Sequence, residues 1–403
     1  MARVDVVIVT WNGREDTLRA VEGVLSQRIP QRISRLTVTV VDNGSTDGTA
    51  SAIRSRFPQV RLHAMWANRG FTGGVRLGVA TSEADYAVLL NNDAIPEPEW
   101  LRELFEAIDA APREVVAVGG QIVDPTGTLA DFARGAMTFD GHAFQIGFRK
   151  NLDEVDVPPP GAEIFFACGG NMIVRREPFL AIGGFDDDYF AYLEDVDFGW
   201  RSWIAGYRTL WEPRARVRHR SSATSDRLGS HERGVLFERN ALQTAVKNYE
   251  DGMMQKALAG VFLAALHRTH RYTVDRNEAE RLRRPPLDEA PIERPPGRGL
   301  LARALRKLGL LAASRTAVLD DELTAMQFRA LEWFFRNEAK IMAKRAAVQA
   351  MRRRPDAEIL EKFPLLVVPT YPGDDALMAS ALFRELTRGM PHIVSRLDDI
   401  MKR

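Results

Sequence analysis

Short apolar runs alternate with helical patterns through the first half of the chain. The β-branched run at residues 6–9 predicts a buried strand, and apolar residues at helical spacing follow it up to residue 25. Further strands are predicted at residues 36–41, 60–64, 86–90, 115–118 and 169–174. Strands that alternate with helices favour an α/β fold, in which helices flank a mostly parallel central sheet.

Polar residues cluster where three of these strands end, at residues 10–13, 42–48 and 91–93. Each cluster suits a turn whose side chains cap the following helix. Ligands of open α/β sheets, however, bind at the carboxyl ends of the strands. The coincidence of three polar clusters at that edge therefore indicates a ligand site more strongly than any one cluster alone.

The second half follows a different pattern, because after residue 236 the sequence is helical almost to its end. Five prolines lie between Pro285 and Pro296. Proline interrupts helices, so we expect a Pro/Arg-rich linker at about residues 283–299.

These patterns predict two parts, a domain at residues 1–250 and a helical C-terminal region at residues 251–403. A helix predicted at 320–354 carries Leu331 and the aromatic residues 333–335. We expect those residues to pack against another helix, within the chain or in a second subunit of a homo-oligomer.

No segment predicts export or membrane insertion. The longest apolar run, residues 257–266, is well short of the roughly 20 residues that span a bilayer. Residues 268–307 are basic, and Leu301, Leu305 and Leu308 share one helical face there. Such a helix can lie on an anionic membrane surface, or dock on its own domain with a solvated basic face. We expect a cytoplasmic protein that is peripheral on the cytoplasmic face of the cell membrane.

Composition narrows the class of protein. The chain has 403 residues, with 55 Lys and Arg against 54 Asp and Glu, which gives a formal net charge of +1. Dedicated nucleic-acid binders usually carry a strong basic excess, so we expect no nucleic-acid partner. The single cysteine, Cys168, excludes an internal disulfide and a multi-cysteine zinc site, and it favours a reducing compartment.

Two segments carry side chains that suit metal binding or proton abstraction. Asn91, Asn92 and Asp93 follow a predicted strand, and their oxygens suit a divalent cation shared with substrate phosphates, although a capped turn explains them as well. Residues 194–197 contain three acids beside aromatic residues. The dipole of a helix N-terminus favours such acids, but partial desolvation would also raise their pKa values and suit one of them to proton abstraction. His219, taken alone, is more typical of a structural histidine.

The motifs in order resemble bacterial glycosyltransferase family 2, particularly its rhamnosyltransferase-like branch, over residues 4–250. The matching segments are Val6 to Gly13 (VVIVTWNG), Val41 to Gly48 (VDNGSTDG), Asn68 to Gly74 (NRGFTGG), Leu90 to Asp93 (LNND) and Leu193 to Asp197 (LEDVD). The resemblance implies the GT-A fold, a nucleotide-sugar donor, a divalent metal (Mg²⁺ or Mn²⁺) and inversion at the anomeric carbon.

The resemblance also assigns roles to individual residues. The residues implied to bind the donor are Thr10, Asn12, Asp42, Asn68, Arg69, Asn91 and Asn92. Among them, Asp42 is implied to contact the base or the ribose. Asp93 is implied as the metal ligand, with His219 completing the metal shell. Asp195, paired with Glu194, matches the general base. Two positions depart from the family: Asn91 replaces the first acid of the Asp-x-Asp motif, and Arg76 stands where many relatives carry asparagine.

The expected reaction is transfer of a sugar, with L-rhamnose from a dTDP donor as the first choice, to a hydroxyl of a cell-surface glycan or lipid-linked acceptor. UDP-hexose and UDP-galactofuranose remain alternative donors. Such an enzyme would serve cell wall or polysaccharide biosynthesis. Two rival readings stay open, namely a nucleotidyltransferase and a catalytically degenerate membrane scaffold or glycan-binding protein.

Overall fold

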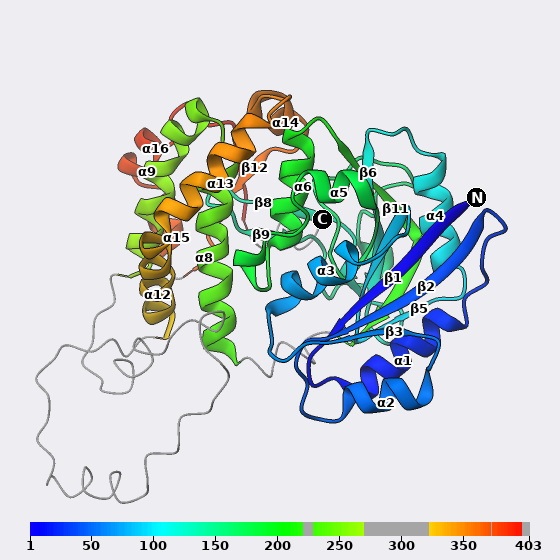
Figure 1. Ribbon diagram of the computed structural model, residues 1–403. Helices are drawn as coiled ribbons and strands as arrows, with labels where there is room; N and C mark the ends of the chain where they lie inside the picture. The colour runs from blue at the N-terminus through cyan, green and yellow to red at the C-terminus, as the bar shows by residue number, and fades with distance from the viewer. Residues whose placement is uncertain (221–228, 270–321, 372, 397–403) are drawn as a thin grey trace, which may run out of the picture.

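A computed structural model of the protein describes residues 1–220, 229–269, 322–371 and 373–396 (Figure 1). The predicted linker at 283–299 and the leucine face at 301–308 lie outside these described residues. Within the described part, no helix is both long enough and apolar enough to cross a membrane.

Strands and helices alternate through the first half of the chain, as predicted. The strands are β1 (Ala2–Thr10), β2 (Ile33–Asp42), β3 (Arg61–Ala64), β4 (Tyr86–Asn91), β5 (Ala94–Pro96), β6 (Val115–Val123), β7 (Ala130–Phe132), β8 (Gly135–Met137), β9 (Ala143–Gln145), β10 (Asn171–Arg175), β11 (Arg208–His219), β12 (Leu365–Val367) and β13 (His392–Val394). The α-helices are α1 (Arg14–Leu25), α2 (Thr49–Arg56), α3 (Gly70–Ala80), α4 (Trp100–Ala110), α5 (Arg176–Ala181), α6 (Glu194–Ile204), α8 (Ser230–Asn248), α9 (Asp251–His267), α12 (Glu322–Arg336), α13 (Glu338–Ala350), α14 (Asp356–Lys362), α15 (Asp374–Met378) and α16 (Ala381–Leu386). Short 3₁₀ turns lie at η1 (Leu152–Glu154) and η2 (Asp187–Tyr189).

The central sheet has the strand order β3-β2-β1-β4-β10-β6-β11-β5, with β7 added beside β6. Strand β1 pairs in parallel with β2 and β4, so that Val6 lies opposite Val38 and Val88. Strands β10 and β5 run antiparallel to their neighbours. The mostly parallel sheet with flanking helices and a C-terminal helical extension confirms the predicted GT-A α/β fold class.

The inner strands are apolar because both faces of the sheet are covered. All of β6 is buried, as is β1 from Val4 onward. Strands buried on both faces need continuous apolar runs, which explains why the sequence shows no alternation there. Helix α3 approaches β1 so closely that a Cβ at Gly74 would lie 2.4 Å from Val9 Cγ1. Glycine at this position therefore sets the distance between the helix and the sheet.

Two parts of the C-terminal region differ from the predicted run of helix. Strands β12 and β13 pair in parallel, with Leu365 opposite His392. Pro364 and Pro369 flank the apolar run that contains β12, and they favour an extended segment there. The helix predicted at 320–354 is divided at Asn337, whose side-chain amide donates a hydrogen bond to Trp333 O at 2.8 Å. A short polar side chain that bonds the local backbone competes with a continuous helix.

The C-terminal helices α9, α12 and α13 lie beside α8, on the side of the molecule away from α1 and α2 (Figure 1). Trp333 and Phe334 are buried, and the Arg239 guanidinium of α8 lies 4.3 Å from the Trp333 ring. This packing confirms that the aromatic face contacts another helix of the same chain, although Phe335 is 58% exposed. The boundary near residue 250 stays a prediction, and one hydrophobic core extends across it.

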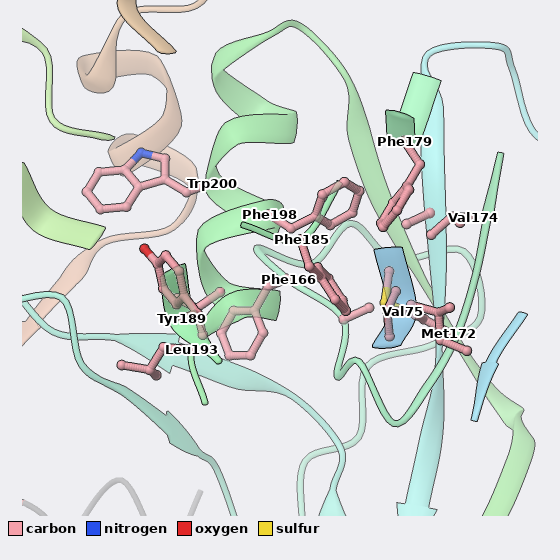
Figure 2. Packing of buried hydrophobic residues seen from close by; sticks show 14 of the residues in the cluster. Val75, Phe166, Met172, Val174, Phe179, Phe185, Tyr189, Leu193, Phe198 and Trp200 are labelled. Atoms are coloured by element: carbon pink, nitrogen blue, oxygen red, sulfur yellow. The ribbon is translucent and has the colours of Figure 1, made fainter. Parts of the chain in front are cut away.

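Aromatic side chains fix helix α6 against the sheet (Figure 2). The Phe198 ring lies 4.8 Å from Phe179 and 5.8 Å from Phe185, measured between centroids, while Trp200 packs edge-on against Tyr249 at 4.8 Å. Helix α6 carries Glu194 and Asp195 in its first turn. The dense aromatic packing therefore fixes the helix that carries both acids.

Candidate active site

A cavity of about 590 Å³ opens at the carboxyl ends of β1 and β4 and extends to the start of α6. Eight of the eleven predicted site residues line it, namely Thr10, Asn68, Asn91, Asn92, Asp93, Glu194, Asp195 and His219. The structure thus brings together motifs that are separated by more than 200 positions in the sequence. It does so at the edge of the sheet where the three polar clusters predicted a ligand site.

Three predicted donor residues, Asn12, Asp42 and Arg69, lie outside the cavity lining. Asn12 Oδ1 accepts a hydrogen bond from Thr46 N at 2.7 Å, and Asp42 Oδ1 accepts one from Ser45 N at 2.9 Å. These bonds fix the turns that follow β1 and β2. The Arg69 guanidinium stacks over the exposed ring of Trp66 at 5.0 Å. Arg76 also faces away from the cavity, where it pairs with Asp187 at 2.6 Å.

Asn43, which the motif analysis did not select, holds the turn at the start of α3, at the edge of the cavity. Its side chain accepts a hydrogen bond from Arg69 N and donates one to Gly70 O, both at 2.8 Å. Gly70 has a φ of 75°, and a Cβ there would lie 2.3 Å from Phe190 O. Glycine therefore allows this turn to touch the loop that precedes α6.

His219 lies between two carboxylates at the end of β11. Its Nε2 is 3.0 Å from Asp93 Oδ1, and its Nδ1 is 2.8 Å from Asp131 Oδ2. Burial alone would lower the pKa of His219, but its hydrogen bonds with Asp131 and Asp93 raise it to about 10. In this arrangement the imidazole is protonated and serves as the counter-charge of both acids. Because an imidazole ligand must be neutral, a cation would bind in place of the Nε2 proton.

These side chains fit a divalent cation that phosphate oxygens would also hold. Among the residues that the structure describes, no set of three His, Cys, Asp or Glu side chains forms a metal site by itself. Asp93 offers an oxygen and His219 Nε2 a nitrogen beside the cavity, while Asp131 would orient the imidazole from its far side. Mg²⁺ bound by one or two protein groups takes further ligands from substrate phosphates. Asn91, whose amide nitrogen is 3.4 Å from His219 Nε2, adds no charge.

Asp195 has both carboxylate oxygens held by the backbone. Oδ2 accepts a hydrogen bond from Gly169 N at 3.0 Å, and Oδ1 accepts one from Val196 N at 2.8 Å. Burial raises the pKa of Asp195, and the backbone hydrogen bonds offset part of that rise. A carboxylate with a raised pKa is a stronger base, and this one is fixed in the cavity wall.

Comparison with known proteins assigns the chain to a family. The family model described as Glycosyl transferase family 2 matches residues 5–183. An N-acetylglucosaminyl-diphospho-decaprenol L-rhamnosyltransferase of Mycobacterium tuberculosis is 32% identical over 216 residues, which cover 48% of this chain and 69% of that protein. The chain belongs to glycosyltransferase family 2. It is a glycosyltransferase, and its resemblance to the rhamnosyltransferase-like branch is confirmed.

Other similar proteins are matched over smaller shares of their own length. The O-antigen biosynthesis protein RfbC of Myxococcus xanthus is 30% identical over 54% of this chain and 17% of its own length. The rhamnosyltransferase WbbL of Escherichia coli is 24% identical over 33% of this chain and 51% of its own length. Among solved structures, GalNAc-T7 with UDP, GalNAc and Mn²⁺ has a TM-score of 0.49 at 17% identity, over 64% of this chain and 50% of that one.

The loop before α6 of this family 2 transferase has a strained backbone. Phe190, Tyr192 and Leu193 have φ values of 63°, 72° and 63°, which non-glycine residues rarely adopt. Asn240 of α8 stabilises the loop, because its amide nitrogen donates to Tyr189 O, Ala191 O and Tyr192 O at 2.8–2.9 Å. Helix α8 thereby sets the position at which Glu194 and Asp195 enter the cavity.

A buried network of ion pairs also fixes the first turn of α6. Asp197 pairs with Arg201 at 2.7 Å and with Lys247 at 2.9 Å. Burial would raise the pKa of Asp197, but the charges of Arg201 and Lys247 lower it. Lys247 also pairs with Asp186 at 2.7 Å, and Lys344 of α13 contacts the same carboxylate. The C-terminal region therefore contributes directly to the support of α6.

The cavity wall opposite the sheet is formed by β9 and by aromatic side chains around it, including Phe144, Phe148 and Phe237. His142, the residue before β9, is buried. Its Nδ1 lies 3.1 Å from Asp140, and its Nε2 lies 3.3 Å from Glu238. Burial would lower the pKa of His142, but the charges of Asp140 and Glu238 raise it to about 10.

Arg268 continues this cluster, pairing with Asp140 at 3.0 Å and with Asp374 at 2.8 Å. The residue after α9 and the first residue of α15 thus support the hairpin of β8 and β9. Sequence reasoning missed Asp131, Asn240, Phe237 and this cluster. None of these residues belongs to a motif, and each is joined to the site by contacts between residues far apart in the chain.

Proposed function

We propose that this glycosyltransferase is an inverting, metal-dependent enzyme that moves a sugar from a nucleotide-sugar donor to an acceptor hydroxyl, with Asp195 as the general base. One observation carries the proposal. The half-buried carboxylate of Asp195, fixed by two backbone hydrogen bonds, shares a single cavity with the Asp93–His219 pair.

Each group has a distinct task in this reaction. Asn68, Asn91 and Asn92 bind the donor beside Thr10. Asp93 and His219 would hold the divalent ion, Mg²⁺ or Mn²⁺, which when bound would neutralise charge on the departing diphosphate. Asp195 takes the proton of the acceptor hydroxyl as that oxygen attacks the anomeric carbon from the face opposite the nucleotide.

A protein acid is not required, in contrast to glycosidases, because a diphosphate leaves without being protonated. Inversion follows from a single displacement with one base. The aromatic wall at Phe144 and Phe237 completes the cavity on the side where an acceptor would enter.

The names of the relatives support a choice of donor and acceptor. The Mycobacterium tuberculosis relative is named as an L-rhamnosyltransferase of N-acetylglucosaminyl-diphospho-decaprenol. We therefore propose L-rhamnose from a dTDP donor, with UDP-sugars as alternatives, and a lipid-linked or cell-surface glycan acceptor in cell wall or polysaccharide biosynthesis. A lipid-linked acceptor would place the enzyme at the cytoplasmic face of the membrane, with residues 251–403 supplying membrane or subunit contacts.

Titration calorimetry with dTDP-, UDP- and GDP-sugars, each with and without Mn²⁺, tests the proposal. We expect one donor to bind, and to bind more tightly with Mn²⁺. Asp93→Asn should remove the Mn²⁺ effect, while Asp153→Asn, in an exposed turn, serves as the matched control. Donor binding that is indifferent to Mn²⁺ in both parent and Asp93→Asn would contradict the metal role.

A further inference from the structure

The aromatic wall of the cavity carries a cation at its rim. Phe148 lines the cavity, and the guanidinium of Arg149 lies over its ring, 5.2 Å from the ring centroid. Arg149 is itself exposed, so the guanidinium stands between the aromatic wall and the solvent. Among the residues that the structure describes, no acidic side chain forms an ion pair with it. This charge is therefore available to a ligand that enters along the aromatic wall.

The backbone at Arg149 is strained and is held in place. Its φ is 63°, in the left-handed region that glycine and asparagine adopt at lower cost than a long side chain. Arg149 N donates to Ala130 O at 2.7 Å, and Ala130 N donates to Lys150 O at 2.8 Å, so the turn is tied to β7. The next residue of β7 is Asp131, which holds His219. An arginine at a strained position tied to the site indicates a functional demand for its charge.

The charges inside the cavity decide where an anionic part of a ligand can lie. Acidic side chains line the interior, and among the described residues no lysine or arginine belongs to this lining. The diphosphate of a nucleotide sugar already calls for a divalent ion there. A second anionic group inside the cavity would be repelled by Asp93 and Asp195. The same group would be stabilised at the rim, beside Arg149.

We propose that Arg149 binds a phosphate group of the acceptor, so that the enzyme selects acceptors whose sugar is carried on a phosphate or diphosphate. The proposal rests on the proposed function, in which Asp195 takes the proton of the acceptor hydroxyl. The acceptor sugar then lies against Phe144 and Phe237, with its reacting hydroxyl toward Asp195 and its phosphate toward the solvent. A guanidinium donates two parallel N–H bonds to phosphate oxygens, and a neutral glycoside offers no charge in their place.

Two acceptors that carry the same sugar test this selection. One is N-acetylglucosamine joined through a diphosphate to a short prenyl chain, and the other is octyl N-acetylglucosaminide. With dTDP-rhamnose and Mn²⁺, and without vesicles, Arg149→Gln should raise KM for the diphosphate acceptor roughly 10-fold and leave kcat unchanged. KM for the octyl glycoside should stay at the parental value. A bond made equally in the ground state and the transition state changes KM alone.

Two further variants serve as controls. Arg149→Lys keeps a positive charge and should retain most of the parental preference for the diphosphate acceptor. Arg113→Gln, at an exposed position that precedes β6 and lies outside the cavity lining, should behave as the parent. If Arg149→Gln raises KM equally for both acceptors, or for neither, the inference is overturned.

Binding measurements separate this inference from the proposed function. Calorimetry of the diphosphate acceptor in EDTA, without donor, excludes a bridging metal ion. We expect Arg149→Gln to bind this acceptor roughly 10-fold more weakly than the parent. If that difference is found but no protein turns over any acceptor, the proposed function fails and the phosphate site stands. Equal affinity in both proteins overturns the inference.

A membrane lipid is the other source of phosphate at this rim. Flotation with phosphatidylglycerol vesicles distinguishes it from the acceptor, and we expect the parent and Arg149→Gln to float equally. If Arg149→Gln loses vesicle binding while its affinity for the diphosphate acceptor stays parental, the phosphate is that of a lipid headgroup and the inference is wrong.

Discussion

The two sides of the cavity are built in different ways. On the donor side, the turns after β1, β2 and β3 hold one another through short side chains such as Asn12, Ser45 and Asn43, within the first 70 residues. On the proposed catalytic side, residues of α8 and α13, from 50 to more than 150 positions later in the chain, hold the loop before α6. The hairpin of β8 and β9 is held by Arg268, which in turn pairs with Asp374 of α15. The donor side is thus local, while the catalytic side depends on the C-terminal region.

This difference predicts that substitutions in α8 lower kcat and leave the affinity for the donor unchanged. Asn240→Leu should lower kcat on the order of 100-fold, because the strained loop loses three hydrogen bonds and Asp195 shifts from its position. Steady-state kinetics and donor titration check this split. Val246→Ala, a buried substitution on the same helix, is the control for lost stability alone. A large rise in donor Kd for Asn240→Leu would break the division between the two sides.

Asp131 contacts His219 Nδ1, while Asp93 contacts Nε2 of the same ring. Asp131→Asn should weaken metal binding about 10- to 100-fold, because the imidazole loses the carboxylate that orients it. Excess Mn²⁺ should restore most of the activity. Asp156→Asn, at an exposed carboxylate, should behave as the parent. An Asp131→Asn enzyme that Mn²⁺ cannot rescue would show that Asp131 acts on the substrate itself.

The sequence predicted much of the donor side and the acids, because those residues lie in short motifs at strand ends. Thr10, Asn91 and Asp93 end strands or follow them directly, and their neighbours in the chain are also their neighbours in space. It did not predict Asp131 or Asn240, which contact the site across 88 and about 50 positions. Asp42 and Asn12 lie in matched motifs, and their side chains bind turns outside the cavity lining, so their donor role stays a prediction.

The His142 cluster should make stability depend on pH on the catalytic side. The pKa of His142 is raised from 6.5 to about 10 in the folded state, so its stabilising charge is fully present below about pH 6.5 and is lost as pH rises toward 10. Denaturant unfolding of the parent should therefore show a loss of a few kcal/mol over this range, and His142→Gln should show a smaller loss. Equal pH dependence in both proteins would mean that His142 does not carry the charge.

The smallest effect is expected on the donor side. Ser45→Ala removes the hydrogen bond that Asn12 N donates to Ser45 Oγ at 2.8 Å. We expect a loss of about 0.5–1.5 kcal/mol in stability and a modest rise in donor Kd, with kcat unchanged. Ser55→Ala, at an exposed position of α2, is the matched control. A fall in kcat without a change in donor Kd would show that this turn serves the catalytic side.

We propose Asp195 as the general base in a cavity whose donor side works independently of it. The most direct test is single-turnover transfer by Asp195→Asn, together with calorimetric binding of the donor and Mn²⁺ to the same protein. We expect transfer to fall about 10²- to 10⁴-fold while donor and metal affinities stay at the parental level. Near-parental transfer by Asp195→Asn with intact donor binding would contradict it.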